Sequence, residues 1–236
     1  MNKFALLIAG TVALTACGGN STQVKLDNDD KKAAYALGFR TGEQMQGRMD
    51  DIDLDSFLAG LRTGALNEGD KALMSPDTMD EVIMAFQQKK MEEQEAEMIK
   101  EADENLAAGA KFRAEHAEKE GVKTTDSGMQ YEVLVEGDGA SPAANDTVVA
   151  HYHGTLIDGT VFDSSVERDE PATFPLDRVI QGWQEALPMM KVGSKWSIVL
   201  PPHLAYGDQG AGGVIGPNAT LVFEVELVDI VKADKK

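Results

Sequence analysis

Residues 151–165 read HYHGTLIDGTVFDSS, a stretch that predicts two strands joined by a tight turn. Apolar or small residues alternate with other residues over 148–157, which is the period of a half-buried strand. Asp158 and Gly159 follow, a pair that two-residue hairpins favour because a primed turn needs positive φ at both central positions. The returning strand ends on Phe162, followed directly by a carboxylate and two hydroxyls. This polar end to an apolar strand is the first indication of a functional site.

The hairpin belongs to a β-rich region over 121–232. Strands are expected where apolar runs are bounded by Gly, Pro, Asn and Asp, and the candidates are 129–135, 147–156, 161–162, 173–176, 194–200 and 219–231. One short helix is expected at 179–190. The pattern predicts an α+β fold in which a twisted antiparallel sheet wraps around one short helix.

The region before it is helical. Two short apolar patterns of helical period occupy 31–74, and Asp53 or Asp55 is expected to cap the second helix. Two helices of this length cannot bury their apolar stripes alone, so a second copy of the chain is the simplest partner. We therefore expect 31–74 to form a helical dimerisation domain in a homodimer.

One long connecting helix is predicted over 75–120. Ser75 and Pro76 form a start signal, and Gly121 is expected to end the helix. The side chains of 87–97 are polar nearly all round, which is typical of a helix that crosses solvent between domains.

The first residues predict export. A charged start and an apolar run too short to span a bilayer occupy 1–16, which indicates a secretory signal peptide. Small residues lead into Cys17, the only cysteine, and this resembles a bacterial lipobox in which the cysteine is lipidated. The alternative is an ordinary signal peptide cut after an alanine, with Cys17 incidental. Residues 17–30 are expected to form a lipid-anchored tether, and 233–236 a short tail.

Gly18 is not the aspartate associated with retention in the inner membrane. We therefore expect a bacterial outer-membrane lipoprotein that faces the periplasm, with exposure at the cell surface left open. The chain has 22 Lys and Arg against 40 Asp and Glu, a net charge of −18. Such an acidic chain argues against nucleic acid and anionic lipid surfaces as partners, so membrane contact is expected through the lipid anchor only.

Five motifs of the β-rich region occur in a fixed order. They are HYxG at 151–154, DGxxFDSS at 158–165, VIxGWxEAL at 179–187, LAYG at 204–207 and IGPNxxLxFxVEL at 215–227. Together they resemble an FKBP-type peptidyl-prolyl cis–trans isomerase. The helical N-terminal region with its long helix resembles the dimerisation module of macrophage infectivity potentiator-type periplasmic foldases. The resemblance implies a folding catalyst that acts on X-Pro bonds of unfolded or partly folded polypeptides, with chaperone activity in the cleft of a V-shaped dimer.

The resemblance also implies a pocket. Its apolar walls would be Tyr152, Phe162, Phe174, Val179, Ile180, Trp183, Ile215 and Phe223, with Trp183 as the floor under the proline ring. Asp163 would face the twisting amide, with Arg168 as its ion-pair partner. The Tyr206 hydroxyl and the backbone N–H of Ile180 would each hold a substrate carbonyl.

The chemistry of such a pocket follows from the amide bond. Isomerisation must twist a bond whose resonance sets a barrier of about 18–20 kcal/mol. No bond breaks, so no nucleophile, metal or other cofactor is required. A water-poor apolar pocket favours the twisted amide, which has lost charge separation, over the planar one. Lowering the barrier by about 7 kcal/mol would accelerate the reaction by roughly 10⁵-fold.

Other readings stay open for single residues. Phe162, Trp183 or Phe223 alone would be read as core, and Asp163 alone as a strand-end cap. His151 and His153 share a strand face, but no third ligand at useful spacing supports a metal site.

The glycines of 210–213 do not form a phosphate loop and are expected to make a flap over the pocket. Gly216 stands where many members of the family have proline, and Ala211 where some have histidine. Two other functions remain: a holdase chaperone with incidental isomerase activity, and a surface adhesion or virulence module that uses the pocket only for binding.

Overall fold

The computed structural model describes residues 24–47, 49 and 51–231. The chain divides into two compact units, with the boundary between Met79 and Asp80. The predicted signal peptide, Cys17 and the 233–236 tail lie outside the described residues. None of the described helices combines the length and the apolar character needed to cross a membrane.

The first unit contains two helices, α1 (Asp29–Met45) and α2 (Leu54–Ala65), and a 3₁₀ turn at Gly69–Lys71. The Asn28 side chain caps α1 by accepting the Lys31 N–H at 2.9 Å, so this helix begins before residue 31 and the predicted tether is too long at that end. Asp53, the first of the two predicted caps, accepts the Ser56 N–H at 2.8 Å. Neither helix contains a buried residue.

Helix α3 runs from Pro76 to Ala117. The Ser75 hydroxyl accepts the Thr78 N–H at 3.2 Å, which is the predicted start signal. The predicted end was wrong, because the helix stops at Ala117 and Gly121, with φ +87°, lies in the turn that follows. Its exposed charges pair along the helix, as in Lys100–Glu104 at 3.8 Å, and pairs of this kind add little stability.

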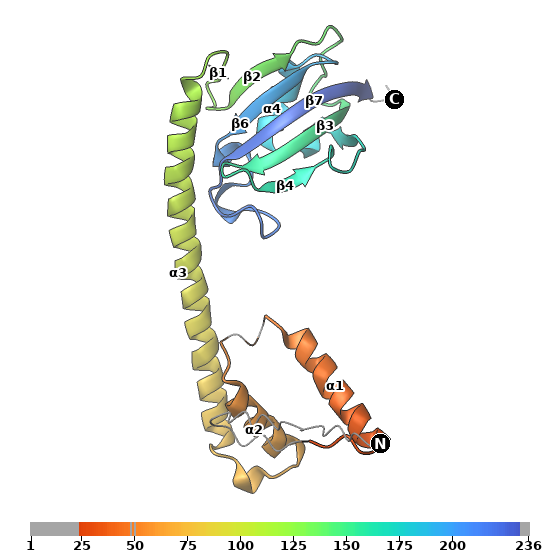
Figure 1. Cartoon of the computed structure of the whole chain (residues 1–236). Coiled ribbons are helices and arrows are strands. Elements are labelled where there is room, and N and C mark those ends of the chain that lie inside the picture. Colours follow the sequence, from red (N-terminus) through yellow and green to blue (C-terminus); the bar gives the residue numbers. More distant parts are fainter. Residues whose placement is uncertain (1–23, 48, 50, 232–236) are drawn as a thin grey trace, which may run out of the picture. The chain divides into compact units, whose positions relative to one another are not determined.

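The second unit is built on one antiparallel sheet of seven strands (Figure 1). The strands are β1 (Lys123–Thr124), β2 (Gln130–Val135), β3 (Thr147–Leu156), β4 (Val161–Ser164), β5 (Ala172–Pro175), β6 (Lys195–Leu200) and β7 (Leu221–Val231). Their order is β1-β2-β6-β7-β3-β4, with β5 also pairing with β3. Strand β1 was not predicted, since two residues carry no periodic signal.

Helix α4 (Gln181–Met189) packs into the sheet to form the core and confirms the α+β prediction. It begins two residues after the predicted start, because Val179 and Ile180 have extended backbone. A Cβ at Gly182 would lie 2.3 Å from Leu200 Cδ2, so a glycine at this position lets the helix approach β6 closely.

The hairpin between β3 and β4 is confirmed, but its predicted turn type was wrong. Only Gly159 has positive φ (+89°), whereas Asp158 does not. The Gly159 N–H donates to the Leu156 carbonyl at 3.0 Å, and the Leu156 N–H donates to the Thr160 carbonyl at 2.9 Å. The loop is therefore a three-residue connection that ends on a left-handed glycine, and the pairing shifts register after Gly154.

Candidate active site

The strand register gathers the site around Gly154. On β3 this glycine pairs with Asp163 of β4 on one side and with Phe223 of β7 on the other. A Cβ here would lie 2.6 Å from Phe162 Cζ and 3.0 Å from Phe223 Cε1. The two rings meet edge to face above the glycine, with centroids 5.4 Å apart. The glycine of the first quoted motif thus provides the space in which these aromatic walls pack.

Trp183 forms the centre of an aromatic cup. Its ring lies 5.4 Å from Tyr152, 5.5 Å from Phe174 and 5.5 Å from Phe223, each nearly perpendicular to it. The indole is only 4% exposed, and its Nε1 has no hydrogen-bond partner among the described residues. The floor of the cup is therefore buried and aromatic.

The remaining predicted wall residues, Val179, Ile180 and Ile215, pack against the same core. Val179 and Ile180 lie in the extended segment before α4, and they are half-buried, whereas Ile215 is buried. The structure thus brings together all eight predicted wall residues, which lie between positions 152 and 223 of the sequence.

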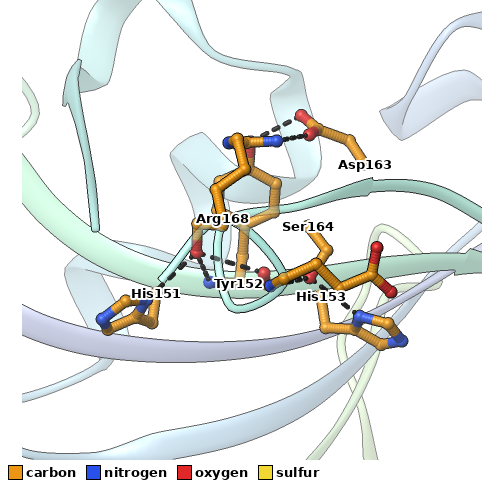
Figure 2. Close-up of polar contacts among 8 residues, drawn as sticks. His151, Tyr152, His153, Asp163, Ser164 and Arg168 are labelled. Carbon is orange, nitrogen blue, oxygen red and sulfur yellow. Dashed lines mark hydrogen bonds and ion pairs between the residues drawn. The ribbon is translucent and has the colours of Figure 1, made fainter. Parts of the chain in front are cut away.

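A polar cluster occupies the rim of the cup (Figure 2). The Tyr152 hydroxyl donates to Asp163 Oδ2 at 2.5 Å, and Arg168 Nη1 donates to Asp163 Oδ1 at 2.5 Å. Arg168 Nη2 also donates to the Tyr152 hydroxyl at 2.9 Å, which closes a triangle of three side chains. The predicted Asp163–Arg168 ion pair is present. An open hollow of about 390 Å³ adjoins it, lined by Val161 to Ser164 together with Glu167 and Arg168.

This triangle fixes the charge of the rim. Partial burial pushes the pKa of Asp163 upward, but the hydrogen bonds from Tyr152 and Arg168 outweigh it and hold the pKa below its usual value. Burial, followed by the hydrogen bond to Asp163, raises the pKa of Tyr152. Asp163 is therefore ionised and Tyr152 neutral at neutral pH.

A buried serine holds Tyr152 in register. The Ser165 hydroxyl accepts the Tyr152 N–H at 2.7 Å and lies 3.2 Å from the Tyr152 carbonyl oxygen. His151 Nδ1 lies 3.2 Å from the same hydroxyl, while His153 Nδ1 lies 3.0 Å from the Ser164 hydroxyl. The two histidines considered for metal binding thus face serines. This role of the serines was not predicted, although both stand in the DGxxFDSS motif.

Two donors at the cup have no partner within the part of the chain that the structure describes. One is the hydroxyl of Tyr206, a residue that is 41% exposed. Burial, and then the negative charge of Asp163, raises its pKa. The Ile180 N–H, directly before α4, likewise donates to none of the described residues. Both groups are free to donate to the carbonyl of a bound ligand.

The fold and site together define a class of protein. The cup is apolar and aromatic, and it has an ionised carboxylate and two available donors at its edge. Such a site can bind and twist a proline-containing segment without covalent chemistry.

Comparison with known proteins gives the family. The model of the FKBP-type peptidyl-prolyl cis-trans isomerase matches residues 139–228, and that of the domain amino terminal to FKBP-type peptidyl-prolyl isomerase matches 30–133. The chain belongs to the FKBP-type peptidyl-prolyl cis-trans isomerase family, which confirms the resemblance seen in the sequence, and it is a peptidyl-prolyl isomerase with the FKBP fold.

Relatives match along nearly the whole chain. The outer membrane protein MIP of Legionella longbeachae is 38% identical, and the match covers 99% of each chain. The peptidyl-prolyl cis-trans isomerase Mip of Coxiella burnetii is 42% identical over 96% of this chain and 94% of its own. The crystal structure of FkpA from Escherichia coli superposes with a TM-score of 0.70 at 41% identity, and covers 88% of this chain and 99% of that one.

Proposed function

We propose that the aromatic cup binds the proline ring of an X-Pro segment and that the polar rim holds the twisting amide. The observation that carries the proposal is the arrangement of three rings around the buried Trp183, with the ionised Asp163 at the edge. Trp183 is the floor, and Phe162, Phe174 and Phe223 are walls. The substrate class is proline-containing unfolded or partly folded polypeptide.

The rim residues have distinct roles in this proposal. The Tyr206 hydroxyl and the Ile180 N–H hold the carbonyls that flank the proline, so that one half of the chain is fixed while the other rotates. Asp163 faces the amide as a charge already held by two donors, and such a charge need not reorganise during the twist. The apolar walls exclude water, which otherwise stabilises the planar, charge-separated amide.

The test is a refolding reaction limited by proline isomerisation. The wild type is expected to accelerate the slow phase, whereas Asp163→Ala and Phe162→Ala should lose most of that acceleration at equal concentration. Asp126→Ala is the control, since it removes an exposed carboxylate from the turn before β2. If all variants accelerate refolding equally, the site assignment is wrong.

The first unit supports a second part of the proposal: a homodimer with chaperone activity. Leu37 of α1 is 70% exposed and Leu61 of α2 is 57% exposed, which leaves the apolar faces of both helices open in the single chain. A second copy of the chain would cover them. If chaperone action is independent of isomerisation, Asp163→Ala should still suppress aggregation of a client without prolines. Loss of both activities together would exclude the holdase alternative.

We further propose that lipidated Cys17 anchors the protein in the outer membrane, facing the periplasm. The lipobox-like sequence before Cys17 supports this, as does the name of the Legionella relative, outer membrane protein MIP. Cys17→Ser should release the protein into the soluble periplasmic fraction and remove the acyl mass from the mature N-terminus. Protease treatment of intact cells distinguishes a periplasmic protein, which is protected, from a surface module.

A further inference from the structure

The flap, defined here as residues 207–220, carries one pocket wall. Ala211 and Ile215 exchange backbone hydrogen bonds of 2.8 and 3.0 Å, which close the loop on itself. The Asn218 N–H donates to the Gly207 carbonyl at 2.8 Å and joins the two ends of the flap. Ile215 is 8% exposed and packs in the core beside the cup. Its position therefore depends on how the flap is held.

One face of α3 holds the base of this flap. Asn105 Nδ2 donates to the Pro217 carbonyl at 3.0 Å, and the Arg113 guanidinium donates to the Thr220 hydroxyl. Between them, a Cβ at Gly109 would lie 2.3 Å from Thr220 Oγ1, so the helix backbone lies directly against that side chain. Positions 105, 109 and 113 are four residues apart and share one helix face. This is a continuous docking face, formed within the second unit.

Gly216 shows how close this contact is. A Cβ at this position would lie 2.0 Å from Glu101 Oε1 and 2.9 Å from Asn105 Nδ2. Gly216 is not among the residues with positive φ, so its backbone conformation does not demand glycine. The side-chain space is occupied by the ends of the Glu101 and Asn105 side chains of α3.

We infer that Asn105 is a positioning residue of the active site, which holds the flap through Pro217 and thereby sets Ile215 against the proline ring. The inference rests on the proposed function, in which Ile215 is a wall of the cup. In this arrangement Ile215 contacts the proline ring and not the twisting amide, so its displacement removes binding from the planar and the twisted state alike. KM should rise while kcat stays nearly constant.

The test uses the full chain and a proline-containing tetrapeptide, together with amide hydrogen exchange at Ala211 and Ile215. Asn105→Ala should raise KM by about three- to tenfold, the size expected for one lost hydrogen bond, with kcat within about twofold. Exchange at both amides should be faster than in the wild type. Asn105→Gln retains the donor and should recover part of both effects. Gln94→Ala is the control, since it removes an exposed carboxamide from the same helix.

A second variant, Gly216→Ala, changes the flap side of its contact with α3. Gly216→Ala should also speed exchange and raise KM, because its methyl group displaces Glu101 and Asn105. Adding Glu101→Ala removes the nearest obstructing atom and should restore part of the wild-type KM. A purely local effect on flap folding would not respond to a truncation on α3.

The results separate the inference from the pocket assignment. The inference is overturned if Asn105→Ala leaves KM unchanged, whether or not exchange is faster. Ile215→Ala tests the pocket itself, and the pocket assignment fails if that variant also keeps the wild-type KM. A raised KM in Ile215→Ala with a normal Asn105→Ala overturns only the role of α3.

Discussion

The two units of this chain treat their apolar residues in opposite ways. In the second unit, the sheet and α4 enclose a continuous core, and the candidate site is an extension of that core. In the first unit, α1 and α2 bury no residue at all, and the connection before α3 leaves Leu73 95% exposed. The second unit is therefore stabilised by its own core, whereas the first is a set of amphipathic helices that requires a partner surface.

The largest expected effect comes from charging α2. Leu58→Lys combined with Leu61→Lys should weaken dimerisation by at least about 100-fold, because an apolar interface does not tolerate buried unpaired ammonium groups. Sedimentation velocity measures the change in mass. Tetrapeptide isomerisation should be unaffected, since the site lies in the other unit. Ser56→Lys, on the opposite face of α2, is the control, and a wild type that is monomeric at micromolar concentration would contradict the prediction.

Alanine substitutions at two glycines, one in each unit, test the difference in packing between the units. Gly154→Ala should lower kcat/KM more than tenfold and destabilise the second unit by about 1–3 kcal/mol, since its methyl group overlaps the Phe162 ring. A Cβ at Gly38 of α1 meets nothing within 4 Å, so Gly38→Ala should stabilise that helix by about 0.5–1 kcal/mol. Thermal unfolding followed by circular dichroism measures both. A destabilising Gly38→Ala would instead place the partner's backbone against α1.

The rim cluster predicts a flat pH profile. Because the pKa of Asp163 is lowered in the folded protein, its carboxylate stays ionised at neutral pH and is protonated only as the pH falls below the ordinary value of 3.8. The raised pKa of Tyr152 likewise keeps its hydroxyl neutral up to pH 10. We expect kcat/KM to be constant between pH 5 and pH 8, as measured with the tetrapeptide. Arg168→Ala should move the acid limb to higher pH, and an inflection near pH 6 in the wild type would argue against this cluster.

The smallest effect is expected on the solvated face of α3. Lys100→Ala removes an exposed pair with Glu104 and should change stability by less than about 0.5 kcal/mol. Chemical denaturation measures this. His116, which is buried and lies 2.9 Å from the Gln130 side-chain oxygen, provides the contrast. A larger loss from Lys100→Ala than from His116→Ala would mean that this part of the helix is not solvated.

Local patterns predicted much of this architecture. The alternation through β3 predicted its bounds, and Ser75 and Pro76 predicted the start of α3. The ordered motifs contain seven of the eight residues expected as walls, and only Phe174 lies outside them. Each of these signals depends on neighbours along the chain. The turn at Asp158 was less predictable, because Asp-Gly is compatible with more than one loop length.

The missed features depend on tertiary contacts. Nothing in the sequence around Ser165 indicates that its hydroxyl binds the backbone of Tyr152 on another strand. Gly216 was noticed only as a departure, because the residues that occupy its side-chain space come from a helix more than a hundred positions earlier. Propensity and periodicity carry no information about contacts between residues so far apart in the sequence.

The orphaned indole at the floor of the cup gives the protein an optical reporter. The chain has two tryptophans, and the other, Trp196, stacks on Tyr131 at 4.6 Å on the far strand pair β2 and β6. With Trp196→Phe, the remaining emission comes from Trp183 alone, which is 4% exposed and whose Nε1 has no hydrogen-bond partner among the described residues. Any segment that covers the indole must perturb this emission. Occupancy of the cup can therefore be read by fluorescence titration, without a label and without turnover.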